Sequence, residues 1–321
     1  MPFFSVIIPT YNRGQLIRET LESVFRQEET SFEVIVVDDG STDDTLEVLQ
    51  GYASRIQILQ QPNAGPGAAR NRAAAQAKGK YLAFLDSDDL WFPWTLAVYR
   101  TVIEEHSDPN IITSVPLECA IDFVVPFKPP SELRCTSFRD YFSSHRRHRT
   151  FGSGLTVVRR DTFLNIQGYA AEFVNAEDLD FMLRFGNSVG FVEIDRPHLV
   201  AWRQHDNNLT RNLASTGDGL TRIINRELAG EYPGGAERRR ERRGIISRHV
   251  RPHSLSCLKS ERWRAGLAFY RQTVLWNLRE RRLRYLLAFP FLTAAGAARA
   301  LWRSRATPNR RKQQCSHRIE S

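Results

Sequence analysis

The residues Tyr81-Leu82-Ala83-Phe84-Leu85-Asp86-Ser87-Asp88-Asp89 join a short apolar run directly to three carboxylates. The apolar part follows Gly79 and is rich in aromatic and aliphatic side chains, so it predicts a buried strand. Carboxylates crowded at one strand end repel each other unless a cation or its ligand lies among them. In open α/β sheets, ligands bind at the carboxyl ends of the strands. The pattern favours a metal or ligand site, although Asp88 or Asp89 could instead cap a helix that begins near Trp91.

Strand and helix patterns alternate through the first hundred residues. Short apolar runs predict strands and one-sided apolar segments predict helices; the strands are at 3–9, 34–37, 56–59 and 81–85, and the helices at 16–25, 45–52, 68–77 and 94–106. Repeated strand–helix units predict an α/β fold with a Rossmann-like, mostly parallel sheet and helices on both of its faces. Further strands are predicted at 155–159, 190–194 and 199–203, a helix at 177–185, and strands with a mobile basic loop between 111 and 150.

Charge divides the chain into two parts of opposite sign. Residues 1–236 contain 23 Lys and Arg against 31 Asp and Glu, a net charge of −8, whereas residues 237–321 contain 22 against 5, a net charge of +17. Glycine-containing segments at 216–219 and 232–235 precede the change. We therefore predict a main domain at 1–215, a linker at 216–236 and a basic amphipathic helical region at 237–321.

Several classes of site gain no support from the sequence. Its four cysteines lie far apart with no CxxC pair, so neither a zinc site nor a disulfide framework is indicated, which suits a reducing cytoplasm. The glycine-rich loop at 63–67 has neither the GxxxxGKS/T pattern of ATPases nor the GxGxxG pattern of dinucleotide-binding folds. The N-terminus lacks the basic start and long apolar stretch of a signal peptide, so we expect a cytoplasmic location.

Six segments of the chain together resemble the family 2 glycosyltransferases that have the GT-A fold. They occur in family order within residues 3–210 and are Ser5-Val6-Ile7-Ile8-Pro9-Thr10-Tyr11-Asn12-Arg13, Val36-Val37-Asp38-Asp39-Gly40-Ser41, Asn63-Ala64-Gly65-Pro66-Gly67-Ala68-Ala69-Arg70-Asn71, the opening stretch at 81–89, Ala176-Glu177-Asp178-Leu179-Asp180 and Trp202-Arg203-Gln204-His205. The resemblance implies an inverting enzyme that moves a sugar from a nucleotide donor, expected to be UDP-linked, to a hydroxyl acceptor in surface polysaccharide, glycolipid or glycoprotein synthesis. Two other functions stay open: a nucleotidyltransferase on a similar sheet, and a non-catalytic, membrane-docked module that binds a nucleotide sugar.

The resemblance also implies a donor-nucleotide site at the carboxyl edge of the sheet. Its expected members are Pro9, Thr10, Tyr11, Arg13, Asp39, Gly67, Arg70, Asp86 and Ser87. Tyr11 can offer a flat face to a base, or it can be a half-buried turn residue. Asp39 can accept the N–H of a pyrimidine ring, which is the role that the family gives to this aspartate, or it can cap the following helix.

The loop at 63–67 leads directly into a helix. Free backbone N–H groups and the positive end of the helix dipole therefore point at whatever binds there. Arg70 lies in the first turn of that helix, where a cation opposes the dipole. This placement is favourable beside an anionic diphosphate; the alternative is an ordinary surface arginine.

Asp86-Ser87-Asp88 matches the DxD motif of the family. Carboxylate oxygens suit a hard divalent ion such as Mg²⁺ or Mn²⁺ that also holds phosphates, and such an ion acts as a Lewis acid on the leaving diphosphate. By resemblance Asp88 is the direct metal ligand, and His205 stands where a histidine can complete the metal shell. A solvated loop histidine is the alternative reading of His205.

Glu177 and Asp178 begin an acidic helical turn. Acidic residues in a first turn are ordinary partners of the helix dipole, but the family places its general base at Asp178. A single base, without a second carboxylate as nucleophile, implies direct displacement with inversion. Gly168 and Tyr169 follow Gln167 where the family has Gly-Gly-Phe, so we expect them, with Glu177, in a loop near the sugar and the acceptor.

The basic tail combines arginines with aromatic and aliphatic residues in a mostly helical pattern from 263 to 302. Its longest uncharged stretch, 285–298, has 14 residues, fewer than the ~20 that span a bilayer. A basic helix with Trp and Leu on its other face is typical of helices that lie in an anionic membrane interface. We therefore expect peripheral attachment to the inner face of the cytoplasmic membrane, in which the inserted residues are Trp263, Trp276, Leu286, Leu287 and Phe289. The alternative is helices packed on the catalytic domain; nucleic-acid binding is not expected, since no recognition motif is present.

Overall fold

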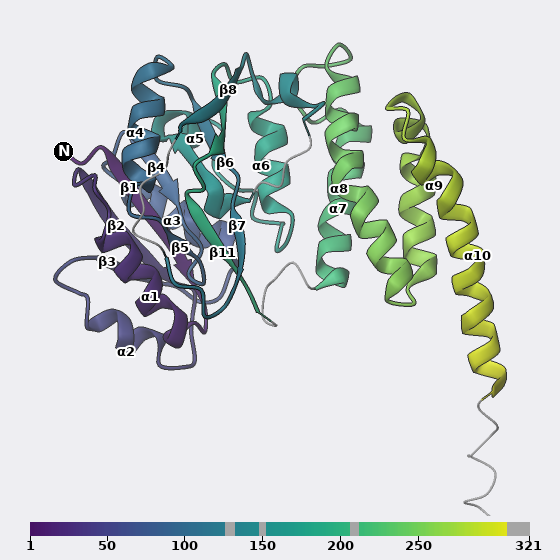
Figure 1. Cartoon of the computed structure of the whole chain (residues 1–321), viewed down its shortest axis with the longest axis horizontal. Coiled ribbons are helices and arrows are strands. Elements are labelled where there is room, and N and C mark those ends of the chain that lie inside the picture. The colour runs from purple at the N-terminus through teal and green to yellow at the C-terminus, as the bar shows by residue number, and fades with distance from the viewer. Residues whose placement is uncertain (126–131, 148–151, 206–211, 307–321) are drawn as a thin grey trace, which may run out of the picture. The chain divides into compact units, whose positions relative to one another are not determined.

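The computed structural model describes residues 1–125, 132–147, 152–205 and 212–306 (Figure 1). The chain divides into two compact units, residues 1–242 and residues 243–321. The end of the predicted basic loop, residues 148–150, lies outside the described residues.

The main sheet of the first unit is mostly parallel. Its strands are β1 (Phe4–Thr10), β2 (Phe32–Asp38), β3 (Gln57–Gln60), β4 (Tyr81–Phe84), β6 (Ile111–Ser114), β8 (Arg134–Phe138), β9 (Thr156–Arg159) and β10 (Phe191–Arg196). They form an eight-stranded sheet in the order β3-β2-β1-β4-β9-β6-β10-β8. Strands β3, β2, β1 and β4 run parallel to one another, as do β6 and β10, whereas β9 and β8 run antiparallel to the strands beside them. This topology confirms the predicted α/β fold.

Side chains along β1 alternate between the two faces of the sheet and are all buried. Both faces are therefore covered, and helices cover them. Phe4, Val6 and Ile8 share a core cluster with apolar side chains of α1 (Gly14–Phe25) and α4 (Thr95–Glu105). Helix α3 (Pro66–Gln76) packs on β1 and β2. The Phe163 ring of α5 (Arg160–Asn165) lies 5.5 Å from that of Phe84 on β4. The remaining short helices of the unit are α2 (Thr45–Gln50), α6 (Glu177–Phe185), η1 (Tyr141–Ser144) and η2 (Ser153–Leu155).

A second, three-stranded sheet brings a distant part of the chain to the end of β4. Its order is β5 (Leu90–Trp91), β11 (Val200–Gln204) and β7 (Leu117–Ala120). β5 follows Asp89 directly and pairs antiparallel with β11, so residues at the end of β11 lie beside the carboxylates. The alternative of a helix starting near Trp91 is wrong, because α4 begins only at Thr95. Capping that helix is therefore not the role of Asp88 or Asp89.

The predicted linker at 216–236 differs from the structure, which has helix α7 (Leu213–Ala229) there. The prediction took its glycines as breakers, but Gly217 and Gly219 lie inside the helix and are buried. A Cβ on Gly219 would lie 2.2 Å from the carbonyl oxygen of Asn175. Glycine at this position therefore permits close packing of α7 and does not mark a loop.

Ion pairs with buried carboxylates hold residues 238–242, which follow α7, to the rest of the first unit. Arg242 donates from Nε to Glu227 Oε2 at 2.6 Å, and both side chains are nearly inaccessible. Arg238 donates to both oxygens of Asp140, at 2.8 and 2.7 Å. These arginines belong to the run 237–243 that the charge pattern assigned to the basic tail, so the first unit ends at residue 242.

The second unit consists of helices. Helix α8 (Arg239–Lys259) crosses the division, and α9 (Trp263–Arg279) and α10 (Leu283–Ala306) follow it. The predicted helical pattern from 263 is confirmed, with a break at residues 280–282. Across the described part of the chain, no helix combines the length and the apolar character that a bilayer crossing requires.

Candidate active site

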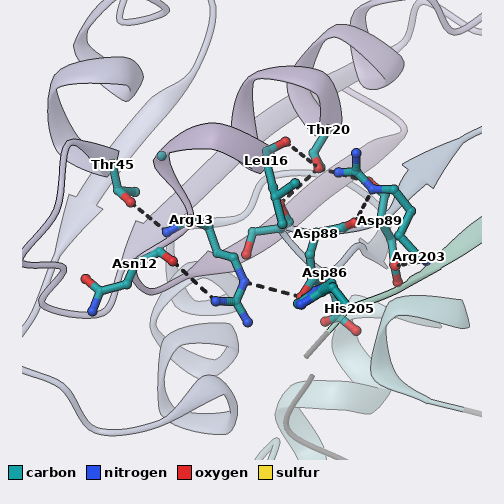
Figure 2. Close-up of polar contacts among 12 residues, drawn as sticks. Asn12, Arg13, Leu16, Thr20, Thr45, Asp86, Asp88, Asp89, Arg203 and His205 are labelled. Atoms are coloured by element: carbon teal, nitrogen blue, oxygen red, sulfur yellow. Dashed lines mark hydrogen bonds and ion pairs between the residues drawn. The ribbon is translucent and has the colours of Figure 1, made fainter. Parts of the chain in front are cut away.

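The carboxylates after β4 diverge into different environments (Figure 2). Asp89 is 4% exposed, and its Oδ1 accepts the backbone N–H of Arg203 at 3.0 Å. Burial, followed by the charges of Asp86 and Asp88, raises the pKa of Asp89 well above its usual range. The hydroxyl of Thr20 donates to the carbonyls of Ser87 and Asp89. Asp89 therefore joins β5 to β11, while α1 holds the backbone of the turn.

Asp88 faces two groups that can share its charge. Its Oδ2 lies 2.9 Å from His205 Nε2 and accepts a hydrogen bond from Arg13 Nε at 3.3 Å (Figure 2). Arg203 donates to the carbonyl of Asp88 and to Glu19, and its side chain is fully buried. The Asp88 backbone is thus fixed by Arg203, while its side chain points to Arg13 and His205. This positioning role of Arg203 was not predicted, since nothing in the sequence indicates that its side chain donates to the Asp88 carbonyl.

These residues fit a divalent ion. Two ligand atoms at about 2.1 Å from one ion and at right angles to each other lie roughly 3 Å apart, close to the observed 2.9 Å between Asp88 Oδ2 and His205 Nε2. Within the described residues, no group of three or more His, Cys, Asp or Glu side chains is arranged as a complete metal site. An ion at Asp88 and His205 would therefore take its other ligands from water and from a diphosphate, as Mg²⁺ commonly does.

Arg70 connects the turn after β4 to helix α6. It is 4% exposed and donates to Asp86 Oδ1 at 2.7 Å and to Glu177 Oε1 at 2.9 Å. Burial by itself lowers the pKa of the Arg70 guanidinium, but the Asp86 and Glu177 carboxylates outweigh it and raise the pKa. The alternative of a surface arginine is therefore wrong. A permanent buried cation lies where the sequence placed the diphosphate.

Asp178 lies at the start of α6, one residue after Glu177. Its Oδ1 accepts the backbone N–H of Leu179 at 2.7 Å. Burial first, and then the charge of Glu177, raises the pKa of Asp178 to about 7. A Cβ on Gly152 would lie 3.9 Å from Asp178 Oδ2, which places the η2 segment against this carboxylate. A carboxyl group whose pKa is raised in this way can accept a proton near neutral pH.

Asp180 anchors the other side of the same helix and was not assigned a role from sequence. Its fully buried carboxylate accepts bonds from Arg184 at 2.8 Å, from Arg226 at 2.6 Å and from the Tyr232 hydroxyl at 2.9 Å. Arg226 and Tyr232 come from α7 and the segment after it. The orientation of α6, and with it the position of Asp178, depends on a part of the chain that the sequence assigned to a linker.

The predicted nucleotide residues gather at the carboxyl ends of β1 and β2. The Asp39 carboxylate accepts the backbone N–H groups of Ala64 and Gly65, at 2.9 and 2.8 Å, and so holds the glycine-rich loop. Tyr11 is 43% exposed, as a ring that stacks on a base has to be. Among the described residues, the buried hydroxyl of Thr10 has no hydrogen-bond partner. Of the three side chains, only that of Tyr11 is exposed, while Asp39 is buried against the loop.

The loop predicted to face the acceptor differs from the expectation. Tyr169 is 2% exposed, and its ring stacks on Phe181 at 4.8 Å. The ring also lies 5.3 Å from the Arg70 guanidinium, and a Cβ on Gly67 would lie 3.1 Å from Tyr169 Cβ. Gly168, which precedes Tyr169, has a φ of +58°, a left-handed conformation that favours glycine. Tyr169 therefore supports Arg70 and α3 from the core, and Glu177 is paired with Arg70.

Comparison with known proteins identifies the family of the first unit. Residues 5–164 match the family model described as Glycosyl transferase family 2. The poly(ribitol-phosphate) beta-N-acetylglucosaminyltransferase TarS of Staphylococcus aureus (strain Mu50 / ATCC 700699) is 43% identical over 109 residues, which are 32% of this chain and 19% of that protein. Matched segments span between 15% and 29% of the first four curated relatives, so the chain covers less than a third of their length.

Two solved structures share the fold. The crystal structure of S. aureus TarS 1–349 in complex with UDP-GlcNAc has a TM-score of 0.64 and 23% identity, covering 85% of this chain and 82% of that chain. The mannosyltransferase PcManGT from Pyrobaculum calidifontis, in complex with GDP-Man and Mn²⁺, has a TM-score of 0.55 and 16% identity, covering 94% and 87%. At this identity the likeness establishes the GT-A type fold.

Proposed function

Because residues 5–164 are a glycosyl transferase family 2 domain, we propose that the chain transfers a sugar from a nucleotide-sugar donor to a hydroxyl acceptor with inversion. The observation that carries the proposal is the bridge made by Arg70. This one buried cation contacts Asp86 of the DxD turn and Glu177 beside Asp178, and so ties the turn that carries Asp88, the proposed metal ligand, to the helix that carries Asp178, the proposed base.

The donor is proposed to be UDP-linked. Exposed Tyr11 suits stacking on a uracil ring, and the Asp39 carboxylate, which accepts the Ala64 and Gly65 N–H groups, is the proposed acceptor of the ring N–H. The UDP-GlcNAc complex of TarS, a relative of the same fold, agrees with this choice. Pro9, Thr10, Gly67 and Ser87 complete the proposed nucleotide site.

In the proposed mechanism, Asp88 and His205 would hold Mn²⁺ or Mg²⁺, and the ion would supply Lewis-acid stabilisation of the charge on the leaving diphosphate. The Mn²⁺ complex of PcManGT supports this cofactor class. Arg70, paired with Asp86 and Glu177, ties the DxD turn to helix α6 on the same side. Asp178 takes the proton of the acceptor hydroxyl as the new carbon–oxygen bond forms and the bond to the diphosphate breaks. With one carboxylate acting as base, the displacement inverts the anomeric centre.

The pH dependence of the reaction should report the ionisation of Asp178. Since its pKa is raised to about 7, the basic form is lost below neutral pH, and kcat/KM should fall toward acid with a midpoint near 7. The measurement is kcat/KM for sugar transfer across this range with metal held at saturation. A profile that stays flat from about pH 6 to pH 8 would contradict a base of this pKa.

A donor screen tests the function itself. The chain is incubated with Mn²⁺ and UDP- or GDP-linked sugars, and thermal stabilisation and product release are recorded. The proposal expects stabilisation by a UDP-sugar and slow release of UDP. Release of pyrophosphate would identify a nucleotidyltransferase, and stabilisation without turnover of any acceptor would favour a non-catalytic binding module.

The acceptor is proposed to be a saccharide or a lipid-linked molecule, with the chain peripheral on the inner face of the cytoplasmic membrane. The support is the charge of the second unit. Residues 243–321 contain 18 Lys and Arg against 3 Asp and Glu, a net charge of +15, once the arginines up to 242 are assigned to the first unit.

A further inference from the structure

Helix α10 exposes a face that is almost entirely apolar. Between residues 283 and 294 eight positions are exposed, and only Arg284 among them is charged. Leu283, Leu287 and Phe291, spaced at i, i+4 and i+8, are 55%, 68% and 77% exposed. An exposed helix face in water is ordinarily polar, and a contiguous apolar surface marks a place where something binds.

The end of α9 adds to this surface. Leu275 and Leu278 are 65% and 53% exposed, and they lie within the last turns before the break that leads into α10. The two helices contact each other through their opposite sides, where the rings of Tyr270 and Phe289 stack at 4.7 Å. The apolar corner formed by the end of α9 and the first turns of α10 is called the α9–α10 face below.

The exposed apolar residues of these helices differ from the set that the sequence was expected to insert into a membrane. Trp276 and Phe289 are 5% and 0% exposed and pack inside the second unit, while Trp263 and Leu286 are half-buried. Of the expected set, only Leu287 lies on the α9–α10 face. Hydrophobicity alone did not separate the two sides of these helices, since both sides carry large apolar residues.

Charge indicates what covers this face. The second unit has a net charge of +15, and Arg271, Arg279, Arg281 and Arg284 are exposed beside the apolar residues. A second copy of the chain would bring the same positive charge against it, whereas an anionic surface would neutralise it. Arginines around an apolar centre are the composition of helices that bind anionic lipid interfaces.

Length decides how such a helix lies. The twelve residues from 283 to 294 extend over about 18 Å of helix, which is short of the roughly 30 Å hydrocarbon core. A helix of this kind lies along the interface with its apolar face in the acyl boundary.

We propose that the α9–α10 face is a docking surface for anionic membranes, with Leu283, Leu287 and Phe291 inserted and the neighbouring arginines on the lipid headgroups. The inference rests on the proposed peripheral location and deepens it by naming the surface that binds the membrane; its test is separate from the proposed sugar transfer, which the first unit carries out. Docking would restrict the catalytic unit to the membrane surface, where a lipid-linked acceptor is found.

The experiment is co-sedimentation of the full chain with vesicles of phosphatidylcholine alone or mixed with phosphatidylglycerol. We expect binding to the anionic vesicles, part of which persists at about 1 M salt, where the Debye length is only about 3 Å. The variant Leu287→Glu/Phe291→Glu should lose this salt-resistant part and weaken partition by at least roughly tenfold per side chain. Changing Arg271, Arg279 and Arg284 to Gln should remove mainly the salt-sensitive part.

Leu228→Glu is the matched control, because Leu228 is a comparably exposed leucine, at 60%, on α7 of the first unit. It should bind vesicles as the unaltered chain does. Melting curves check that each variant is folded, and release of UDP from a UDP-sugar checks the first unit separately. The proposal is overturned if the unaltered chain ignores anionic vesicles, if Leu287→Glu/Phe291→Glu binds them equally well, or if that variant only converts a dimer into a monomer.

Discussion

Replacing Asp178 with asparagine should reduce turnover roughly 10²- to 10⁴-fold while donor affinity stays nearly unchanged. Asparagine keeps the shape of the side chain and can still accept the backbone N–H of Leu179, which now binds Asp178 Oδ1 at 2.7 Å. It cannot take a proton from an acceptor hydroxyl. The loss should therefore fall on kcat, since the metal ligand Asp88 and the bridging Arg70 are untouched.

Stability provides a check that Asp178→Asn is not simply misfolded. The folded-state pKa of Asp178 is raised above the usual value of 3.8 to about 7, so the folded chain holds a proton that the unfolded chain has released. The stability contributed by this group is fully present below the unfolded pKa and is lost as pH rises through the folded pKa. The variant should therefore melt at or above the temperature of the unaltered chain at pH 8, where Asp178 is ionised.

The neighbouring carboxylate supplies a control. Glu177→Gln removes the charge that, after burial, raises the pKa of Asp178, so the pH profile should move toward acid while turnover persists. It also leaves Arg70 paired with Asp86 alone among these two carboxylates, so donor affinity is measured beside the pH profile. Should Asp178→Asn lose donor affinity and keep its turnover at saturation, Asp178 would be a binding residue and the base would be another group.

Sequence patterns predicted the elements that are continuous and buried. β1 and β4 are buried along their whole length, so they appear as unbroken apolar runs, and the loops after them carry the polar residues. The edge of the sheet where Asp39, Asp88 and Tyr11 gather follows from the rule that parallel strands present their carboxyl ends together. The resemblance added His205, which lies far from Asp88 in sequence.

The missed features depend on partners that are distant in sequence. Arg238 and Arg242 were assigned to the basic tail, but Asp140 and Glu227 of the first unit hold them, and no local pattern reveals such a pair. Gly219 was taken as a breaker, although it lies in a helix where only glycine fits against the Asn175 carbonyl. Tyr169 was placed near the acceptor, yet its ring is buried beneath Arg70. In each case tertiary packing overrides the local signal.

Asp88→Ala should abolish the dependence of UDP binding on Mn²⁺. The carboxylate of Asp88 lies beside the imidazole of His205. Without that carboxylate, His205 would be the one proposed protein ligand left for the ion. The fold should survive, because Arg203 holds the Asp88 backbone carbonyl and not its side chain. The measurement is calorimetric UDP affinity with and without Mn²⁺, and the expected result is that the two affinities become equal.

A carboxylate at the same edge of the sheet provides the matched control. Asp38 ends β2, is 3% exposed and accepts the backbone N–H of Ser41 at 3.1 Å, so Asp38→Asn removes a charge there without touching Asp88. Its UDP binding should still strengthen when Mn²⁺ is added. In Asp88→Ala, by contrast, adding Mn²⁺ should leave the UDP affinity unchanged. If Mn²⁺ still strengthens UDP binding in Asp88→Ala, the ion is held by other groups, and Asp86 becomes the ligand to test.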